Sequence, residues 1–242
     1  LYWCDVLGYL VAGEYADWGA DIVNPSTHED IMNEWSEVVQ RDFNHPCILM
    51  WTPFNERTFE KTDHTVRDFL QKMVRLTRGL DPTRPIIDTS GYIHVETDIY
   101  DSHDYEQDPL KFRSHYDRFG RTGLSSDLWR HHEEVSIPYR GQPFIVSEYG
   151  GTWWSPDAPE DEKRWGYGQK PSSSEEFLKR YRALTDGLLM NPRVSGFAYT
   201  QLYDVEQEVN GLHTYDRRPK FDPQIIREVN SRKAAIEGVS VS

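Results

Sequence analysis

The sequence is poor in the residues that mark disulfide-bonded and metal-binding domains. Cysteine occurs twice among the 242 residues, at Cys4 and Cys47. Neither lies in a C-x-x-C or another metal-ligand spacing, so we interpret both as small buried hydrophobic side chains. Long apolar runs are also absent, since none approaches the roughly 20 residues of a membrane-spanning helix. We therefore expect no membrane partner.

Basic residues are outnumbered, with 27 Lys+Arg against 40 Asp+Glu and a formal net charge of −13. Binding to a phosphate backbone needs clustered lysine and arginine, and the longest basic grouping, 217–220 (RRPK), is short. We expect no nucleic-acid partner. Aromatic residues make up 13% of the chain, which predicts a folded core and not a disordered segment.

The chain lacks an initiating methionine and the basic and apolar segments of a signal peptide. We interpret its start at Leu1 as a position inside a larger protein. It also lacks the glycine-rich patterns GxGxxG and GxxxxGK[ST], which argues against a doubly wound nucleotide-binding fold. We expect no cofactor.

What the sequence does have is a regular alternation of short apolar runs and helical patterns. Six strands are predicted, at residues 6–14, 48–56, 86–90, 98–105, 143–150 and 194–202. Helices are predicted around 31–39, after a capping box at Ser26 and Glu29, and at 66–74, in pieces over 111–135, after the serines 172–174, and at 223–236. The alternation predicts an α/β fold with a parallel sheet, and without a linker we expect one domain over 1–242.

Polar residues collect at the ends of the predicted strands. They are Glu14, Asn55, Glu56, His103, Tyr105, Glu148, Gln201 and Asp204. A (β/α)8 TIM barrel places its chemistry at the carboxyl ends of several strands, so this distribution favours a barrel over an open sheet.

Two carboxylates, Glu56 and Glu148, end very apolar strands. Strand ends on opposite sides of a barrel mouth face each other, so the two side chains can converge. Two opposed carboxylates without metal ligands suffice for glycosidic bond hydrolysis, one as an acid and the other as an ionised nucleophile or base. Spacing alone does not distinguish this pair from two ordinary strand-end acids.

Four segments carry longer motifs: 51–56 (WTPFNE, preceded by His45 and Pro46), 81–85 (DPTRP), 143–150 (PFIVSEYG) and 197–212 (FAYTQLYDVEQEVNGL). In this order they resemble strand four, the start of strand five, strand seven and strand eight of glycoside hydrolase family 2, which contains β-galactosidases, β-glucuronidases and β-mannosidases. The resemblance covers essentially the whole chain.

The resemblance implies a retaining mechanism, with Glu56 as acid/base and Glu148 as nucleophile. Asn55 would hydrogen-bond the sugar 2-hydroxyl, a contact that tightens in the transition state. Tyr105 matches the position of a tyrosine or histidine beside the nucleophile, where its hydroxyl would keep Glu148 ionised. His103 lies two residues earlier and shares that face of the strand, as a substrate-binding or a structural histidine.

The chain departs from the family in its strand number. It begins at the third strand of the eight, with residues 6–14, so we expect a partial barrel that is truncated at its N-terminus. Such a barrel has unpaired edges. Other domains or chains would then have to complete it.

The resemblance also bears on the substrate, which we expect to be a carbohydrate. Trp154 follows the nucleophile and is the predicted wall of the sugar pocket, although a loop tryptophan can equally cover a barrel rim. The β-glucuronidases of the family carry an Asn-x-Lys motif for the uronic carboxylate. The matching stretch is Asn210-Gly211-Leu212 and has no lysine. We therefore expect an exo-acting enzyme on terminal non-reducing β-glycosides, foremost β-galactosides.

Three alternatives are compatible with the sequence. A metal hydrolase is suggested by residues 131–134 (HHEE), but this run lacks the i, i+4 histidine pair of a helical zinc site and is better explained as a charged helix face. An endo-acting glycanase of the same barrel clan shares the two glutamates. A non-catalytic sugar-binding fragment is compatible with the missing strands.

Overall fold

The computed structural model of the chain describes residues 1–155 and 163–238. The chain forms two compact units, Leu1–Ser102 with Arg130–Pro143 and His103–Trp129 with Phe144–Ser242. Among the described residues, every helix is too short or too polar to cross a membrane.

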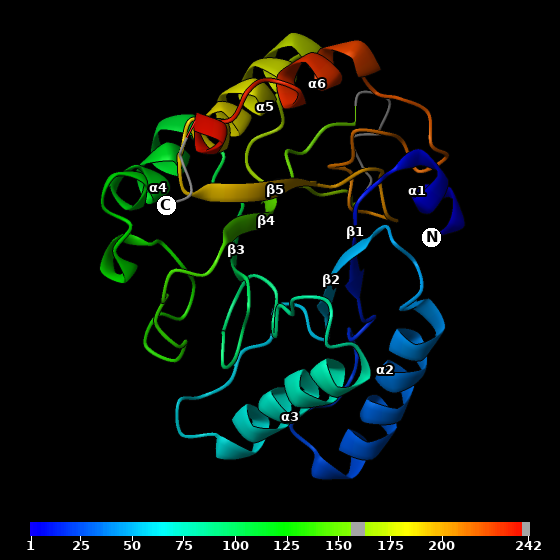
Figure 1. Ribbon diagram of the computed structural model, residues 1–242. Helices are drawn as coiled ribbons and strands as arrows, with labels where there is room; N and C mark the ends of the chain where they lie inside the picture. The colour runs from blue at the N-terminus through cyan, green and yellow to red at the C-terminus, as the bar shows by residue number, and fades with distance from the viewer. Residues whose placement is uncertain (156–162, 239–242) are drawn as a thin grey trace. The chain divides into compact units, whose positions relative to one another are not determined.

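The first unit is built on two parallel strands and two long helices. Its elements are α1 (Tyr2–Leu7), β1 (Val11–Glu14), η1 (Pro25–Thr27), α2 (His28–Asp42), β2 (Ile48–Thr52) and α3 (His64–Leu80). β1 pairs with β2 in parallel, and α2 packs against α3, as Figure 1 shows. The indoles of Trp35 and Trp51 meet edge to face at 5.8 Å in the core between the helices and the strands.

The predicted apolar face of α3 is confirmed, because Val66, Phe69, Leu70, Met73 and Val74 are all buried. The side chain of Asp63 caps the helix by accepting a hydrogen bond from Val66 N at 3.1 Å. The capping box predicted for α2 is wrong. Asn24 instead accepts from Ser26 N and caps the short η1 helix, which leads directly into α2 at His28.

The second unit contains a sheet in the order β3-β4-β5. Its elements are β3 (Tyr100–Asp104), which carries the chain from one unit to the other, α4 (Pro109–Thr122), η2 (Ser125–Asp127), β4 (Phe144–Gly150), α5 (Ser174–Leu189), β5 (Val194–Thr200), α6 (Pro223–Asn230) and η3 (Ala235–Gly238). β4 and β5 are parallel, with Tyr149 opposite Tyr199. α5 packs on both strands and against α4 and α6 (Figure 1). Its predicted cap is confirmed, since Ser173 accepts from Glu176 N at 3.2 Å.

Several predicted elements differ from the structure. The strand predicted at residues 6–14 begins only at Val11, because Val6 and Leu7 belong to the helix α1. Within the described ranges the chain has five strands against the six predicted, because residues 86–90 form only isolated parallel bridges, Trp51 with Ile86 and Asn55 with Ser90. Residues 131–134 form turns and not a helix, and the rings of His131 and His132 pack on Tyr92. The last helix ends at Asn230 and not at residue 236.

Candidate active site

The first unit carries Asn55 and Glu56, which follow the end of β2. The backbone N–H of Asn55 donates to Asp17 Oδ2 at 3.2 Å, and Asn55 forms a parallel bridge with Ser90. The Asn55 side chain is nearly buried, and its Oδ1 has no hydrogen-bond partner within the described part of the chain. A buried amide oxygen of this kind can accept a hydrogen bond from a ligand hydroxyl.

The backbone of Glu56 is in the left-handed region, with φ +50°. Its N–H donates to the carbonyl of Ser90 at 2.9 Å, which ties the end of β2 to the segment after Ile86. The adjacent guanidinium of Arg57 is directed at Asp17, with Nε 2.6 Å from Oδ2 and Nη2 bonded to the Asp17 carbonyl. An arginine paired directly with Glu56 would favour the ionised carboxylate and would count against an acid role. The guanidinium of Arg57 is paired with Asp17 instead.

The motif 81–85 is hydrogen-bonded to β2 and to the segment before it. Asp81 accepts hydrogen bonds from Trp51 Nε1 at 2.9 Å and from the guanidinium of Arg84 at 2.6 Å. Arg84 also donates to the carbonyls of Ile48 and His45. Although burial opposes it, hydrogen bonding holds the pKa of Asp81 well below its ordinary value. These hydrogen bonds therefore fix β2, the strand that leads to Asn55 and Glu56.

The second unit carries Glu148 on β4, together with side chains from both neighbouring strands. The hydroxyl of Tyr105, just after β3, donates to Glu148 Oε2, and Thr200 Oγ1, at the end of β5, donates to the same oxygen at 3.1 Å. Nε2 of the buried His103 lies 3.6 Å from Glu148 Oε1. The carboxylate is partly exposed and thus combines fixed donors with access from solvent. This is the arrangement that a carboxylate nucleophile requires.

Tyr167 holds Tyr105 in place from the long loop after β4. The two rings stack with centroids 3.8 Å apart and an interplanar angle of 4°. Gly151 has φ +60°, and a Cβ there would lie 2.5 Å from the Tyr167 ring, so a larger residue would push the ring away. Gln107 adds a clamp, donating to the carbonyls of Tyr105 and Gly150.

Trp154 lies in the hydrophobic core of the second unit. It packs with Phe177 and Phe221, and only 7% of it is exposed. This packing suits a side chain that covers the rim, and its role as a pocket wall stays a prediction.

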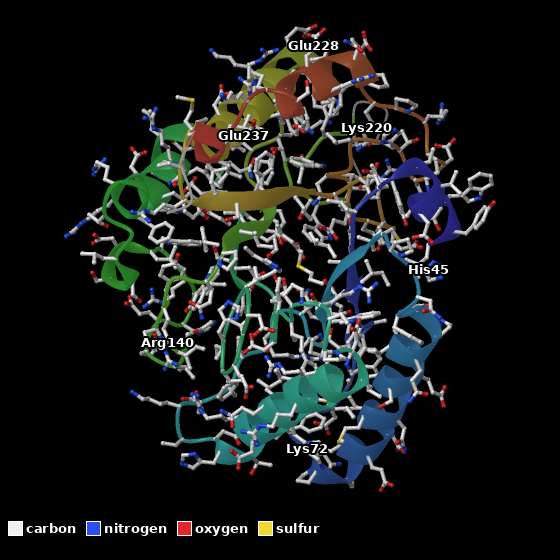
Figure 2. All side chains as sticks on the ribbon, in the orientation of Figure 1. His45, Lys72, Arg140, Lys220, Glu228 and Glu237 are labelled. Carbon is white, nitrogen blue, oxygen red and sulfur yellow. The ribbon has the colours of Figure 1, made fainter. Side chains whose placement is uncertain are left out.

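Asn210, in the stretch that we compared with the Asn-x-Lys motif, is fully buried. Its Oδ1 accepts from Gln201 Nε2 and its Nδ2 donates to Glu208 Oε1, each at 2.9 Å. Lys220, labelled in Figure 2 on the segment before α6, is held by Asp204 Oδ1 at 2.7 Å and by the carbonyl of Trp154 at 2.6 Å. The Asn210 amide and the Lys220 ammonium are thus both hydrogen-bonded to other groups of the second unit.

A cavity of about 410 Å³ opens in the second unit among residues that follow β4 and β5. Its wall contains both signs of charge, including Asp204, Asp216, Arg218 and Lys220. These four are paired with one another, Lys220 with Asp204 and Arg218 with Asp216. The cavity therefore offers no excess charge of one sign from these residues, and Glu148 is not in its wall.

One cluster with metal-ligand atoms lies within the first unit, formed by Asp5, His45 (labelled in Figure 2) and Cys47. Asp5 accepts from His45 Nδ1 at 2.6 Å and from Cys47 N at 2.9 Å. Both carboxylate oxygens are already used in joining α1 to the start of β2, so the cluster is explained as a structural contact.

The structure thus brings together Glu148, His103 and Tyr105 in the second unit, and places Asn55 and Glu56 next to each other in the first. Sequence reasoning missed Thr200 and Tyr167. Thr200 lies inside the strand-eight motif, directly before Gln201, and its position at a strand end was a usable signal. Tyr167 lies in a loop without periodicity, and nothing local indicates that its ring stacks on Tyr105.

Comparisons with known proteins agree with these motifs. A β-galactosidase of Thermoanaerobacterium thermosulfurigenes is 27% identical over 166 residues, which are 66% of this chain and 20% of that protein. A β-glucuronidase of Paenibacillus borealis is 29% identical over 219 residues, 83% of this chain and 33% of that protein. The chain therefore spans between a fifth and a third of the length of these two relatives.

A solved structure of a β-glucuronidase from an uncultured Clostridium sp. has a TM-score of 0.68 at 22% identity, and the match covers 96% of this chain and 42% of that one. At this identity the likeness concerns the fold alone. The family model described as "Glycosyl hydrolases family 2, TIM barrel domain" matches residues 8–234. Because that match takes in most of the sequence, the chain belongs to the glycosyl hydrolases of family 2 and represents their TIM-barrel domain.

Proposed function

We propose that the protein carrying this chain is a retaining exo-β-glycosidase that cleaves terminal non-reducing β-glycosides by double displacement. The observation that carries the proposal is the carboxylate of Glu148 on β4, which accepts hydrogen bonds from Tyr105 and Thr200 and remains partly exposed. A fixed and accessible carboxylate is what the first step of a retaining glycosidase needs.

In the first step, a Glu148 oxygen attacks the anomeric carbon while the glycosidic C–O bond breaks. Glu56, protonated at that moment, gives its proton to the departing oxygen. In the second step, Glu56 takes a proton from water, the water oxygen attacks the anomeric carbon, and the bond to Glu148 breaks. Two inversions at one carbon give net retention. Asn55 is proposed to bind the sugar 2-hydroxyl through its buried amide.

We assign the strands of this chain to strands three to eight of the barrel. In this assignment β1 and β2 are the third and fourth, the bridged segment 86–90 is the fifth, and β3, β4 and β5 are the sixth to eighth. Strands one and two would come from other segments of the whole protein or from another chain, which is the partner that the proposal requires.

For the substrate we favour a neutral hexopyranoside, foremost a β-galactoside. The stretch 210–212 has Leu212 where the β-glucuronidase motif has its lysine, and Asn210 is engaged by Gln201 and Glu208. A β-glucuronide is the second candidate, because the Paenibacillus borealis relative is named as a β-glucuronidase.

The test is covalent labelling of the full-length protein with a 2-deoxy-2-fluoro-β-galactoside that has an activated leaving group. Such a compound traps the glycosyl-enzyme, so peptide mapping should find the sugar on Glu148, and Glu148→Gln should remain unlabelled. A label on Glu56 would reverse the two roles. Cleavage inside a polysaccharide would indicate an endo-acting glycanase, and binding without turnover would indicate a sugar-binding fragment.

A further inference from the structure

The first unit contains a histidine that is completely buried between two aspartates. Nδ1 of His94 lies 2.7 Å from Asp88 Oδ1. Nε2 of the same ring lies 3.0 Å from the Asp101 carbonyl oxygen and 3.2 Å from Asp101 Oδ1. All three side chains are at most 1% exposed. Buried charges are expensive unless they are paired, so this cluster needs a structural or functional reason.

The acceptors on both sides of the ring favour a protonated histidine: Nδ1 faces Asp88 Oδ1 and Nε2 faces the Asp101 carbonyl oxygen, while the Asp101 N–H lies farther from Nε2, at 3.3 Å. Burial alone would favour the neutral ring, but the two carboxylates outweigh it and raise the pKa of His94 to about 10. The edge-to-face contact with Tyr100, at 4.4 Å between ring centroids, adds packing without charge. The cation therefore holds Asp88 and Asp101 together inside the unit.

Asp101 passes this restraint on to Ser90. Its Oδ2 accepts hydrogen bonds from Ser90 Oγ at 2.8 Å and from Gly91 N at 3.0 Å. Ser90 in turn bonds the backbone on both sides of Asn55: its N–H donates to the Phe54 carbonyl at 2.8 Å, and its carbonyl accepts from Glu56 N at 2.9 Å. An unbroken chain of polar contacts thus runs from His94 to the backbone of Glu56.

The backbone of Glu56 is a place where such a restraint matters. At φ +50° a residue other than glycine pays about 1–2 kcal/mol relative to the right-handed region. Relaxation to a negative φ would redirect the Cα–Cβ bond and move the carboxyl group with it. The hydrogen bond from Glu56 N to Ser90 opposes that relaxation, provided that Ser90 itself is held.

We propose that His94, acting through Asp101 and Ser90, is a positioning residue that holds the carboxyl group of Glu56 in the direction needed for proton transfer to the leaving group. The inference rests on the proposed acid/base role of Glu56 and adds the residue that keeps it in place.

The test uses His94→Gln in the full-length protein, which removes the cation and keeps a polar side chain of similar size. The values of kcat/KM, which report the first step, are measured for β-galactosides with a dinitrophenyl leaving group and with a methyl leaving group. A misplaced acid should cost the methyl galactoside on the order of 10²-fold, because that leaving group needs the proton. The dinitrophenyl galactoside should change by less than about 3-fold, since its leaving group needs little protonation.

Two further variants test the connection from His94 through Asp101 and Ser90 to Glu56. Ser90→Ala removes the hydroxyl that bonds Asp101 and leaves the buried ion pairs intact, so it should show the same selectivity with a smaller loss. If circular dichroism shows that His94→Gln is unfolded, Ser90→Ala alone tests the positioning role. His45→Gln is the matched control, a histidine of the same unit that is also paired with a carboxylate, Asp5. It should change both substrates equally.

A double variant separates this inference from the proposed function. In a Glu56→Ala background, His94→Gln should have no further effect on the methyl galactoside. Equal losses for both leaving groups, or a further loss in that background, would overturn the positioning role while Glu56 keeps its own. If Glu56→Ala by itself does not discriminate between the leaving groups, the acid role of Glu56 fails, and the positioning role fails with it.

Discussion

The hydroxyl of Tyr105, which directly follows the strand next to the one that carries the glutamate, donates a hydrogen bond to the carboxylate of Glu148. Burial and the negative charge of Glu148 raise the pKa of Tyr105 well above its ordinary value of 10. The phenol therefore stays protonated and remains a donor across any working pH. Tyr167, stacked on its ring, keeps the hydroxyl in line with the carboxylate.

Replacing Tyr105 with Phe should lower kcat while leaving the fold unchanged. A hydrogen bond to a charged group is worth about 1.5–3 kcal/mol, which corresponds to roughly a 10- to 100-fold loss. Steady-state kinetics on an aryl β-galactoside measures it. Tyr181→Phe is the matched control, because it removes a hydroxyl that bonds Asn230 in the same unit, and it should cost far less. A loss of equal size in both variants would contradict a specific role for Tyr105.

Glu56→Ala should impair glycosides with poor leaving groups far more than activated aryl glycosides in the first step, because only the former need a proton. With activated substrates the glycosyl-enzyme should accumulate, since water is no longer deprotonated in the second step. Added azide should restore turnover and give a glycosyl azide of retained configuration. The corresponding Glu148→Ala variant should give an inverted azide. Product anomers are read by NMR, and an inverted product from Glu56→Ala would contradict the assignment.

The carboxyl groups of Glu56 and Glu148 should lie about 5–5.5 Å apart in the assembled site, the separation of a retaining glycosidase. A crystal structure of the full-length protein measures it directly. A separation of about 9 Å would leave room for a water between carboxylate and sugar, and would indicate inversion instead.

Substrates that differ only at C6 should be distinguished. We expect kcat/KM for a nitrophenyl β-galactoside to exceed kcat/KM for the matching galacturonide. The same order is expected for a nitrophenyl β-glucoside and the matching glucuronide. The reason is the proposed match of residues 210–212 with the Asn-x-Lys motif, in which Leu212 would stand in place of the carboxylate-binding lysine, while Asn210 is engaged by Gln201 and Glu208. A preference for both uronides would overturn the neutral-sugar proposal and favour a β-glucuronidase.

The buried His94 cluster should make stability depend on pH. The pKa of this histidine rises from an ordinary 6.5 to about 10 in the fold. Protonation therefore stabilises the folded state fully below about pH 6.5, and the contribution, on the order of a few kcal/mol, is lost as the pH rises towards 10. The groups that face the ring are Asp88, Asp101 and the Tyr100 phenol.

Urea unfolding of the wild type and of His94→Gln measures this effect as a difference, in which the titrating groups remote from His94 cancel. The stability advantage of the wild type should shrink between pH 6.5 and 10. A constant difference over that range would show that His94 is not charged in the folded protein.

Much of the scaffold could be predicted from local sequence patterns. The apolar face of α3, the serine cap of α5 and the apolar strands that lead to Glu56 and Glu148 all follow from periodicity and from residue chemistry. The errors fell where local signals are weak. Residues 86–90 have the composition of a strand, but they form bridges only at Ile86 and Ser90, and the Asp88 side chain between them bonds His94, Val95 and Glu96.

The sequence by itself determined the family and the parallel α/β scaffold, and it supplied the hypothesis of two catalytic glutamates, because these depend on residue types at fixed short spacings. Only the tertiary structure decided the partners of the polar side chains. Arg57 bonds Asp17 and not the adjacent Glu56, and Tyr167 stacks on Tyr105 across a long loop. Both results depend on which distant segments the fold places together. A side chain can reach several neighbours, and it takes the partner that compensates best for its loss of water.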